Sequence, residues 1–151
     1  MTLSAAEADR RIANVLSVGT IVSIDNATGR ARVRVGDLET PPIPVMQLRS
    51  GAIRMHWMPS VGEQVTIAAP SGDVARGFVM GSLPIDGNMV APDAASPTMD
   101  LGGGTLRVIG RLYVDGDIEV TGDVVASGIS LVHHTHGGVQ QGGANTKEPN
   151  R

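Results

Sequence analysis

Three histidines crowd into four residues near the end of the chain, within the segment LVHHTHGGVQQGG. In an extended strand His134 and His136 lie on the same side, whereas His133 faces the other way and is predicted to be a bystander. Imidazole nitrogen is a ligand for Fe, Zn, Cu and Ni, so the pair predicts a metal site. One chain supplies only two ligands, which makes a weak site unless other copies of the chain contribute.

A six-residue glycine repeat leads directly into these histidines. Its glycines are Gly104, Gly110, Gly116, Gly122 and Gly128. Apolar residues follow most of them at the second and fourth positions, on one face of a short strand. Two apolar side chains per repeat bury too little area to offset the ordering entropy of the backbone, so the segment cannot fold alone.

Other copies of the chain could supply the missing surface. Three chains wound around one axis would bury every apolar face and pair the open strand edges. This predicts an intertwined trimeric β-helix over residues 104–132, with a plain meander capping the preceding domain as the alternative.

A threefold axis changes the ligand count at the histidines. Two imidazoles from each of three chains give six nitrogens, which match an octahedral metal and leave no position for substrate or water. Tetrahedral zinc would leave two ligands idle, so one Fe ion per trimer is the first choice, with Zn or Ni as alternatives. We therefore predict His134 and His136 as metal ligands, no catalytic residues, and a metal-binding apex and tail over residues 133–151.

A short helix is predicted over residues 1–16. Ser4 and Glu7 have the spacing of a capping box at its start. Apolar residues then follow at spacings of three, four and three: Ala5, Ala8, Ile12 and Val15. This narrow seam suits a helix that packs either on a partner or on its own domain.

A small β-barrel is predicted over residues 17–88. Short alternating strands such as VGTIVSID and RARVRV are separated by the turns NATG and PSGD. Four or five such strands in a short span favour a barrel of the OB type. Residues 89–103, rich in Pro, Ala, Asp and Gly, are predicted to be a linker, and the chain as a whole is predicted to be all-β after its helix.

The composition argues against several functions. There is no cysteine, so disulfides and thiolate metal sites are excluded. A net charge of −3 with one Trp, one Tyr and one Phe speaks against a nucleic-acid groove, although an OB-fold single-stranded nucleic-acid-binding module with a trimerising tail is the alternative. An iron enzyme built on two histidines needs a nearby carboxylate, and none follows His136 before Glu148, so we predict no enzyme. No signal peptide or bilayer-spanning apolar run is visible.

The chain resembles the baseplate assembly protein V family of contractile phages. The resemblance rests on VGTIVSID with RARVRV, on PSVGEQVTIAAPSGD, on the glycine repeat and on HTHGGVQQGG, and it covers nearly the whole chain. It implies an N-terminal OB domain, an intertwined trimeric β-helix and an apex where paired histidines of three chains bind one iron. By this resemblance, the paired histidine ligands of this chain would be His134 and His136.

The resemblance also implies a function. Members of the family form the central spike of the baseplate, a trimeric needle that sheath contraction drives through the bacterial outer membrane. The implied partners are two further copies of the chain, the baseplate hub protein, the end of the tail tube and, transiently, the outer membrane, with no nucleic acid. The expected location is the baseplate tip of a virion or a tailocin particle, made in the cytoplasm of the bacterial host.

Overall fold

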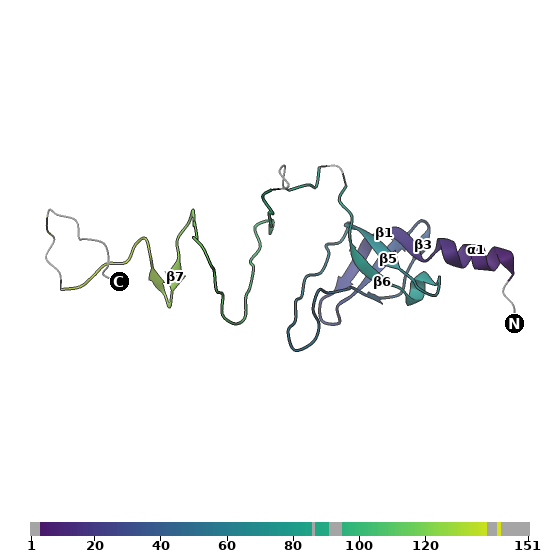
Figure 1. Cartoon of the computed structure of the whole chain (residues 1–151), viewed down its shortest axis with the longest axis horizontal. Helices are drawn as coiled ribbons and strands as arrows, with labels where there is room; N and C mark the ends of the chain where they lie inside the picture. The colour runs from purple at the N-terminus through teal and green to yellow at the C-terminus, as the bar shows by residue number, and fades with distance from the viewer. Residues whose placement is uncertain (1–3, 86, 91–94, 139–141, 143–151) are drawn as a thin grey trace. The chain divides into compact units, whose positions relative to one another are not determined.

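The computed structural model describes residues 4–85, 87–90, 95–138 and 142 (Figure 1). It divides the chain into two units, Met1–Asp100 and Leu101–Arg151, with the division inside the segment 89–103 predicted to be a linker. Among the described residues no helix is long and apolar enough to cross a membrane. Within the described ranges, the regular structure apart from one short helix near the N-terminus and one 3-10 turn is β-strand, which confirms the predicted all-β class.

Helix α1 (Ala5–Ala13) is supported by a cap and by side-chain pairs. The Ser4 hydroxyl oxygen accepts a hydrogen bond from the Glu7 backbone N–H at 3.3 Å. The Glu7 carboxylate accepts hydrogen bonds from Arg10 at 2.9 Å and from Arg11 at 2.8 Å, and these bonds lower the pKa of Glu7 to about 2. The predicted helix over residues 1–16 is too long at its end, because pairing with the barrel takes over from Leu16.

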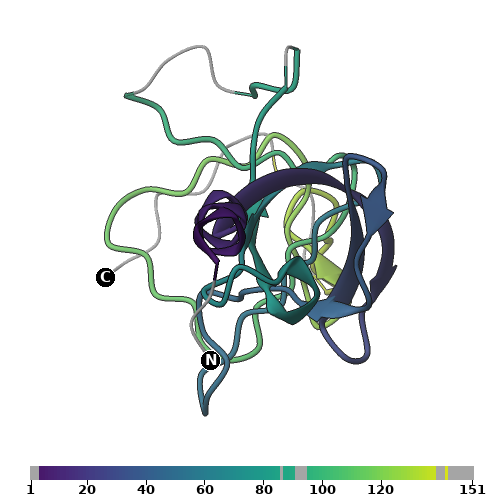
Figure 2. The same cartoon turned by 90° about the vertical axis from the view of Figure 1, so that its right-hand side faces the viewer.

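Six strands form the antiparallel sheet of the first unit, and they curve around a common centre (Figure 2). β1 (Leu16–Asp25) lies between β2 (Arg30–Val35) and β5 (Gln64–Ala68). β2 also pairs with β3 (Leu38–Glu39) and β4 (Ile43–Pro44), while β5 pairs with β6 (Phe78–Ser82) after the 3-10 turn η1 (Val74–Arg76). A bridge between Val45 and Val79 closes the sheet into a barrel.

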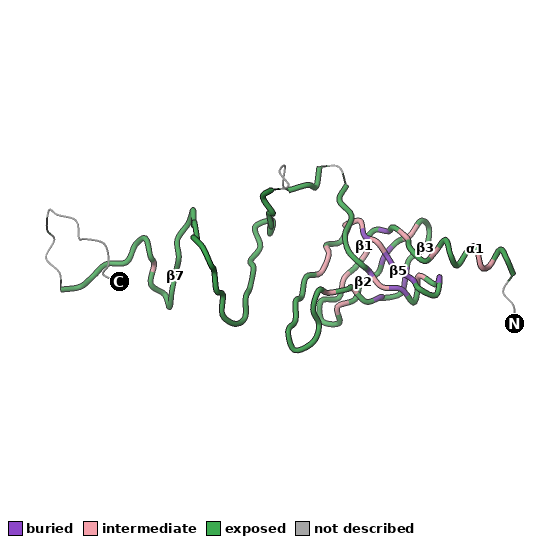
Figure 3. Tube along the Cα trace, viewed as in Figure 1, coloured by how far each residue is buried: buried purple, intermediate pink, exposed green. Residues whose placement is uncertain are grey.

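The barrel core is small and aliphatic. Its buried residues are Ile21, Ala31, Val33, Ile43, Val65, Ile67 and Val79. They recur at every second position of their strands, as expected when one face of a strand points inward. None of these core residues is aromatic, which explains how a barrel can form from a chain so poor in aromatic residues (Figure 3).

At Gly19 the backbone of β1 leaves no room for a side chain beside β2. A Cβ atom there would lie 2.6 Å from the Arg34 carbonyl oxygen and 2.6 Å from Val33 Cγ1. We expect Gly19→Ala to lower the free energy of unfolding by about 1–3 kcal/mol, because the strand must shift to admit a methyl group. Urea unfolding followed by the fluorescence of Trp57 measures this change. Gly51→Ala is the matched control, since a Cβ there meets no atom within 4 Å, and equal stability of the two variants would contradict the close approach.

In the second unit the described residues contain a single hairpin, formed by β7 (Val125–Ala126) and β8 (Ile129–Ser130). The β-helix predicted over residues 104–132 is not formed within one chain, and residues 104–124 carry no strand. Every described residue from 101 to 138 is exposed except Ser130, which is half-buried (Figure 3). The apolar repeat therefore finds no packing surface in its own chain, as its low apolar content per repeat predicts.

The repeat glycines differ in backbone conformation. Gly116 has φ 140°, a conformation that side chains rarely adopt, whereas Gly122 has no positive φ and open space around its Cβ position. We expect Gly116→Val to lower the melting temperature and loosen the assembly, because a β-branched residue is strained at this φ. A thermal scan at fixed chain concentration measures the effect. The Gly122→Val variant should have a lower melting temperature only if another copy of the chain packs at that position. A Gly116→Val variant that melts like the wild type would contradict the strain expected at Gly116.

Candidate metal centre

A tight hairpin stands immediately before the histidines. Ser127 and Gly128 form its turn with φ of 52° and 82°, the two positive values that a type I′ turn requires. The Leu131 N–H donates to the Val124 carbonyl at 2.8 Å, so the ladder continues one bond beyond the paired strands. The hairpin thus fixes the backbone at the point where it turns toward the histidines.

Asp123 joins the start of this hairpin to the turn that follows it. Its carboxylate accepts hydrogen bonds from the Ser130 hydroxyl and, at 3.1 Å, from the Val132 backbone N–H. The bond from Ser130 is the main cause that holds the pKa of Asp123 below its ordinary value, followed by the bond from Val132. The ionised carboxylate therefore stabilises the turn that carries the histidines.

Ser130 connects this carboxylate to the histidine backbone. The Ser130 hydroxyl oxygen accepts a hydrogen bond from the His133 N–H at 2.8 Å. The Ser130 carbonyl accepts one from the His134 N–H at 3.2 Å. One half-buried residue therefore holds the backbone of two successive histidines.

The ring of His134 is oriented by main-chain carbonyls. Its Nδ1 lies 2.9 Å from the Ser130 carbonyl oxygen and 3.0 Å from that of Leu131. Carbonyl oxygens only accept hydrogen bonds, so in the neutral ring Nδ1 carries the proton and Nε2 keeps its lone pair free. A histidine held through its other nitrogen in this way is the usual arrangement of a metal ligand.

The structure brings the rings of His134 and His136 side by side, with centroids 5.1 Å apart and planes at 80°. Rings at this separation can both reach one ion at metal–nitrogen distances of about 2.0–2.1 Å. A turn over residues 131–133 precedes the two histidines, and residues 134–136 carry no assigned strand. His56, the fourth histidine, belongs to the other unit.

One chain does not complete a metal site. Among the described residues, no group of three or more His, Cys, Asp or Glu side chains could hold an ion. Two imidazoles fit a metal as donors but leave most of its coordination positions to be filled by other molecules. A metal held by this pair would therefore need further ligands from other molecules.

Asp123 and Ser130 were not anticipated from the sequence. The available signal was the Ser127–Gly128 pair between the short apolar runs VVA and ISL, which marks a two-residue hairpin turn. Such a turn pairs the residues on either side of it and would have brought Asp123 near Ser130. The regular glycine spacing concealed this signal, because it suggests one uniform repeat.

Comparison with known proteins finds a family match in each of two regions of the chain. Residues 17–83 match the type VI secretion system/phage-baseplate injector OB domain, and residues 128–150 match the GpV apex motif. Over 74 residues the chain is 39% identical to the spike protein of Escherichia phage P2. This alignment covers 49% of the chain and 35% of that relative, so the chain aligns with about a third of the relative's length.

The first match spans the whole barrel from β1 to β6 and confirms its predicted OB type. The chain therefore carries, in this order, a region similar to an injector OB domain and a region similar to an apex motif. Both matches, and the similarity to a phage spike protein, agree with the resemblance to the baseplate assembly protein V family.

Proposed function

We propose that this chain forms the central spike of a contractile tail baseplate, a trimeric needle that pierces the bacterial outer membrane when the sheath contracts. The observation that carries the proposal is the order of parts along the chain: an injector OB domain, a glycine repeat and an apex motif. The similarity to a phage spike protein supports the same role.

The exposed repeat supports a trimer. Leu112 is 71% exposed and Ile118 is 68% exposed in the single chain, and the other apolar residues of the repeat are exposed as well. Each aliphatic side chain contributes about 1.5–3 kcal/mol when it is fully buried, so winding three chains together recovers energy that one chain cannot. Interwound strands also resist shear, because no chain can leave without breaking many ladder bonds.

The apex is proposed to hold one Fe ion per trimer, with Zn or Ni as alternatives. His134 and His136 of three chains supply six nitrogens, and the Ser130 and Leu131 carbonyls orient the first ring of each pair. When bound, the ion ties the three chain ends together, and with six ligands it leaves no position for a substrate. The chain is therefore proposed to be structural and not an enzyme.

The proposed partners follow from this role. They are two further copies of the chain, the baseplate hub protein, the end of the tail tube and, transiently, the bacterial outer membrane. The proposed location is the tip of a virion baseplate or of a tailocin, after synthesis in the cytoplasm of the bacterial host. We also propose the division of the chain into a helix (residues 1–16), a barrel (17–88), a linker (89–103), a β-helical shaft (104–132) and an apex with its tail (133–151).

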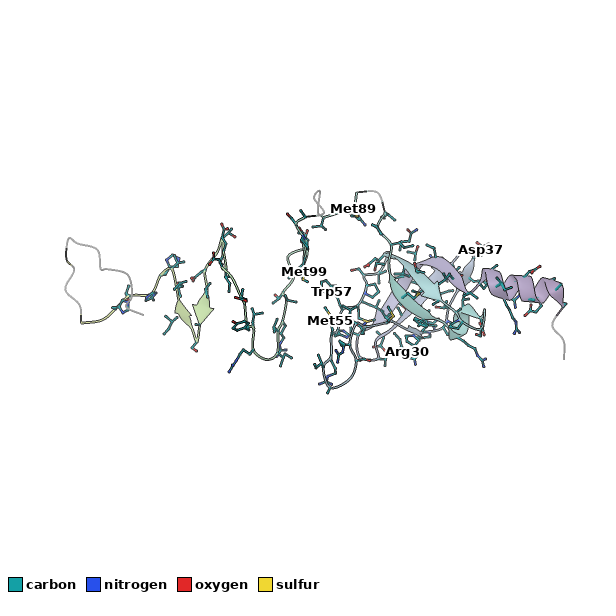
Figure 4. All side chains as sticks on the ribbon, viewed as in Figure 1. Arg30, Asp37, Met55, Trp57, Met89 and Met99 are labelled. Atoms are coloured by element: carbon teal, nitrogen blue, oxygen red, sulfur yellow. The ribbon has the colours of Figure 1, made fainter. Side chains whose placement is uncertain are left out.

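The nucleic-acid-binding alternative is not favoured. The arginines of β2 are engaged within the barrel: Arg30 donates to the Pro42 carbonyl at 2.9 Å, and Arg32 lies 3.5 Å from Glu39. Trp57 lies beside Met55 on the loop between β4 and β5, and a single tryptophan provides little stacking surface (Figure 4).

The proposal is tested by measuring mass and metal content on one sample of the full chain. Light scattering should give three times the 15.6 kDa of the chain, and mass spectrometry should find one metal ion per three chains. A monomer, a metal-to-chain ratio near one, or a trimer purified without chelators that carries no metal would contradict the proposal.

A further inference from the structure

Helix α1 presents an apolar stripe that its own chain covers only in part, since Ala8 is half-buried whereas Ala5 and Ile12 are exposed. None of its residues is buried, and Ile12 is 70% exposed. We call Ala5, Ala8 and Ile12 of the helix, together with Val15 just beyond its end, the α1 seam; their spacing in sequence is that of the a and d positions of a heptad. A helix of nine residues is marginal in water even with a good cap, so its stability requires that this stripe be buried.

The loop after β5 contacts the C-terminal end of α1 and extends its apolar surface. A Cβ on Gly72 would lie 2.5 Å from the Arg11 carbonyl oxygen, so the loop after β5 packs directly on the helix backbone. A groove lined by Ile12, Val15 and Pro70 runs between the seam and this loop. Leu16 continues the apolar surface onto β1 and is 60% exposed. The seam is therefore part of a fixed surface and not of a loose tail.

Opposite charges flank the seam. At about 100° per residue, Asp9 stands on one side of the stripe and Arg11 on the other. Arg11 pairs with Glu7 of its own helix, whereas no ion pair within the described ranges involves Asp9. Around a rotation axis with parallel helices, the basic flank of each copy meets the acidic flank of the next, and the contacts close into a ring. The surface is thus complementary to another copy of itself.

We infer that the α1 seams of three copies pack together around the threefold axis as a short parallel three-helix cluster. The inference rests on the proposed trimer. Besides the contacts proposed for the repeat and the apex, it adds a contact among the three chains in the N-terminal part of each. The small side chains of Ala5 and Ala8 allow close approach of the helices, and Ile12 and Val15 fill the wider layers.

The absence of cysteine from the chain allows a direct test. Ile12→Cys places one thiol in the seam, and Ala6→Cys places one on the opposite face of the same helix. In a three-helix cluster the seam thiols come within the Cα separation of roughly 4.4–6.8 Å that a disulfide requires. Mild oxidation of full-length trimer should join two of every three Ile12→Cys chains, at a rate that does not change on dilution. The Ala6→Cys chains should cross-link at least about tenfold more slowly, because their effective concentration is lower.

Light scattering on the same samples separates the possible failures. A monomer before oxidation would overturn the proposed trimer itself. An intact trimer in which Ile12→Cys does not cross-link, or cross-links no faster than Ala6→Cys, would overturn only the helix cluster and leave the seam to a different partner. Cross-linking that rises with protein concentration would show contact between separate particles and would also overturn the inference.

Discussion

The double variant His134→Ala/His136→Ala is expected to remain a trimer and to contain no metal. The two changes remove both imidazoles that each chain contributes, so all six proposed nitrogens are lost together. The backbone bonds from Ser130 to His133 and His134 do not depend on the rings, and the repeat that drives association is untouched. Metal content should fall from one ion per three chains to none, as measured by mass spectrometry beside light scattering.

His133→Ala is the matched control for this experiment. His133 contributes its backbone N–H to Ser130, and its ring is not proposed to bind the ion. We expect the control to keep its metal. Metal retained by the double variant, or lost from the control, would show that the ligands are assigned wrongly, and a monomeric double variant would show that the ion and not the repeat holds the chains together.

The barrel could be predicted from the sequence because its information is local. Strands such as RARVRV alternate between inward and outward residues, and the turns NATG and PSGD separate them. The end of the helix was predicted less well. Val15 extends the apolar period of the helix beyond Ala13, but Leu16 pairs with Ala68, a residue far away in sequence. Helical periodicity cannot reveal such competition from a distant strand.

The shaft and the apex show two further limits. The glycine repeat predicted that the segment needs partners, and among its described residues from 101 to 138 the single chain has strands only at β7 and β8. The backbone just before the histidines is bonded to Asp123, whose bond to the Val132 N–H spans nine residues. A carboxylate in a polar, glycine-rich segment resembles any solvated charge, so residue type alone did not identify this role.

Asp123→Ala is expected to weaken metal binding at the apex about tenfold, although Asp123 is not a proposed ligand. Residues that orient metal ligands typically account for roughly 10–100-fold in affinity, and Asp123 acts through Ser130, so we expect the lower end of that range. The carboxylate accepts from the Ser130 hydroxyl and the Val132 N–H, and Ser130 in turn holds His133 and His134. Competition with a chelator, at a trimer mass verified by light scattering, measures the change.

Two variants make the Asp123 prediction specific. Asp123→Asn keeps an oxygen that can accept from Val132 and should restore most of the affinity, while Asp117→Ala, which removes an acid of the same repeat, should leave the affinity unchanged.

The pH dependence of the hairpin provides a second measurement. Because folding lowers the pKa of Asp123, its carboxylate stabilises the hairpin above the ordinary pKa of the group, and this stabilisation is lost as the pH falls through the lowered value. An intact Asp123→Ala trimer that holds its metal as tightly as the wild type would show that the turn positions the histidines without this carboxylate.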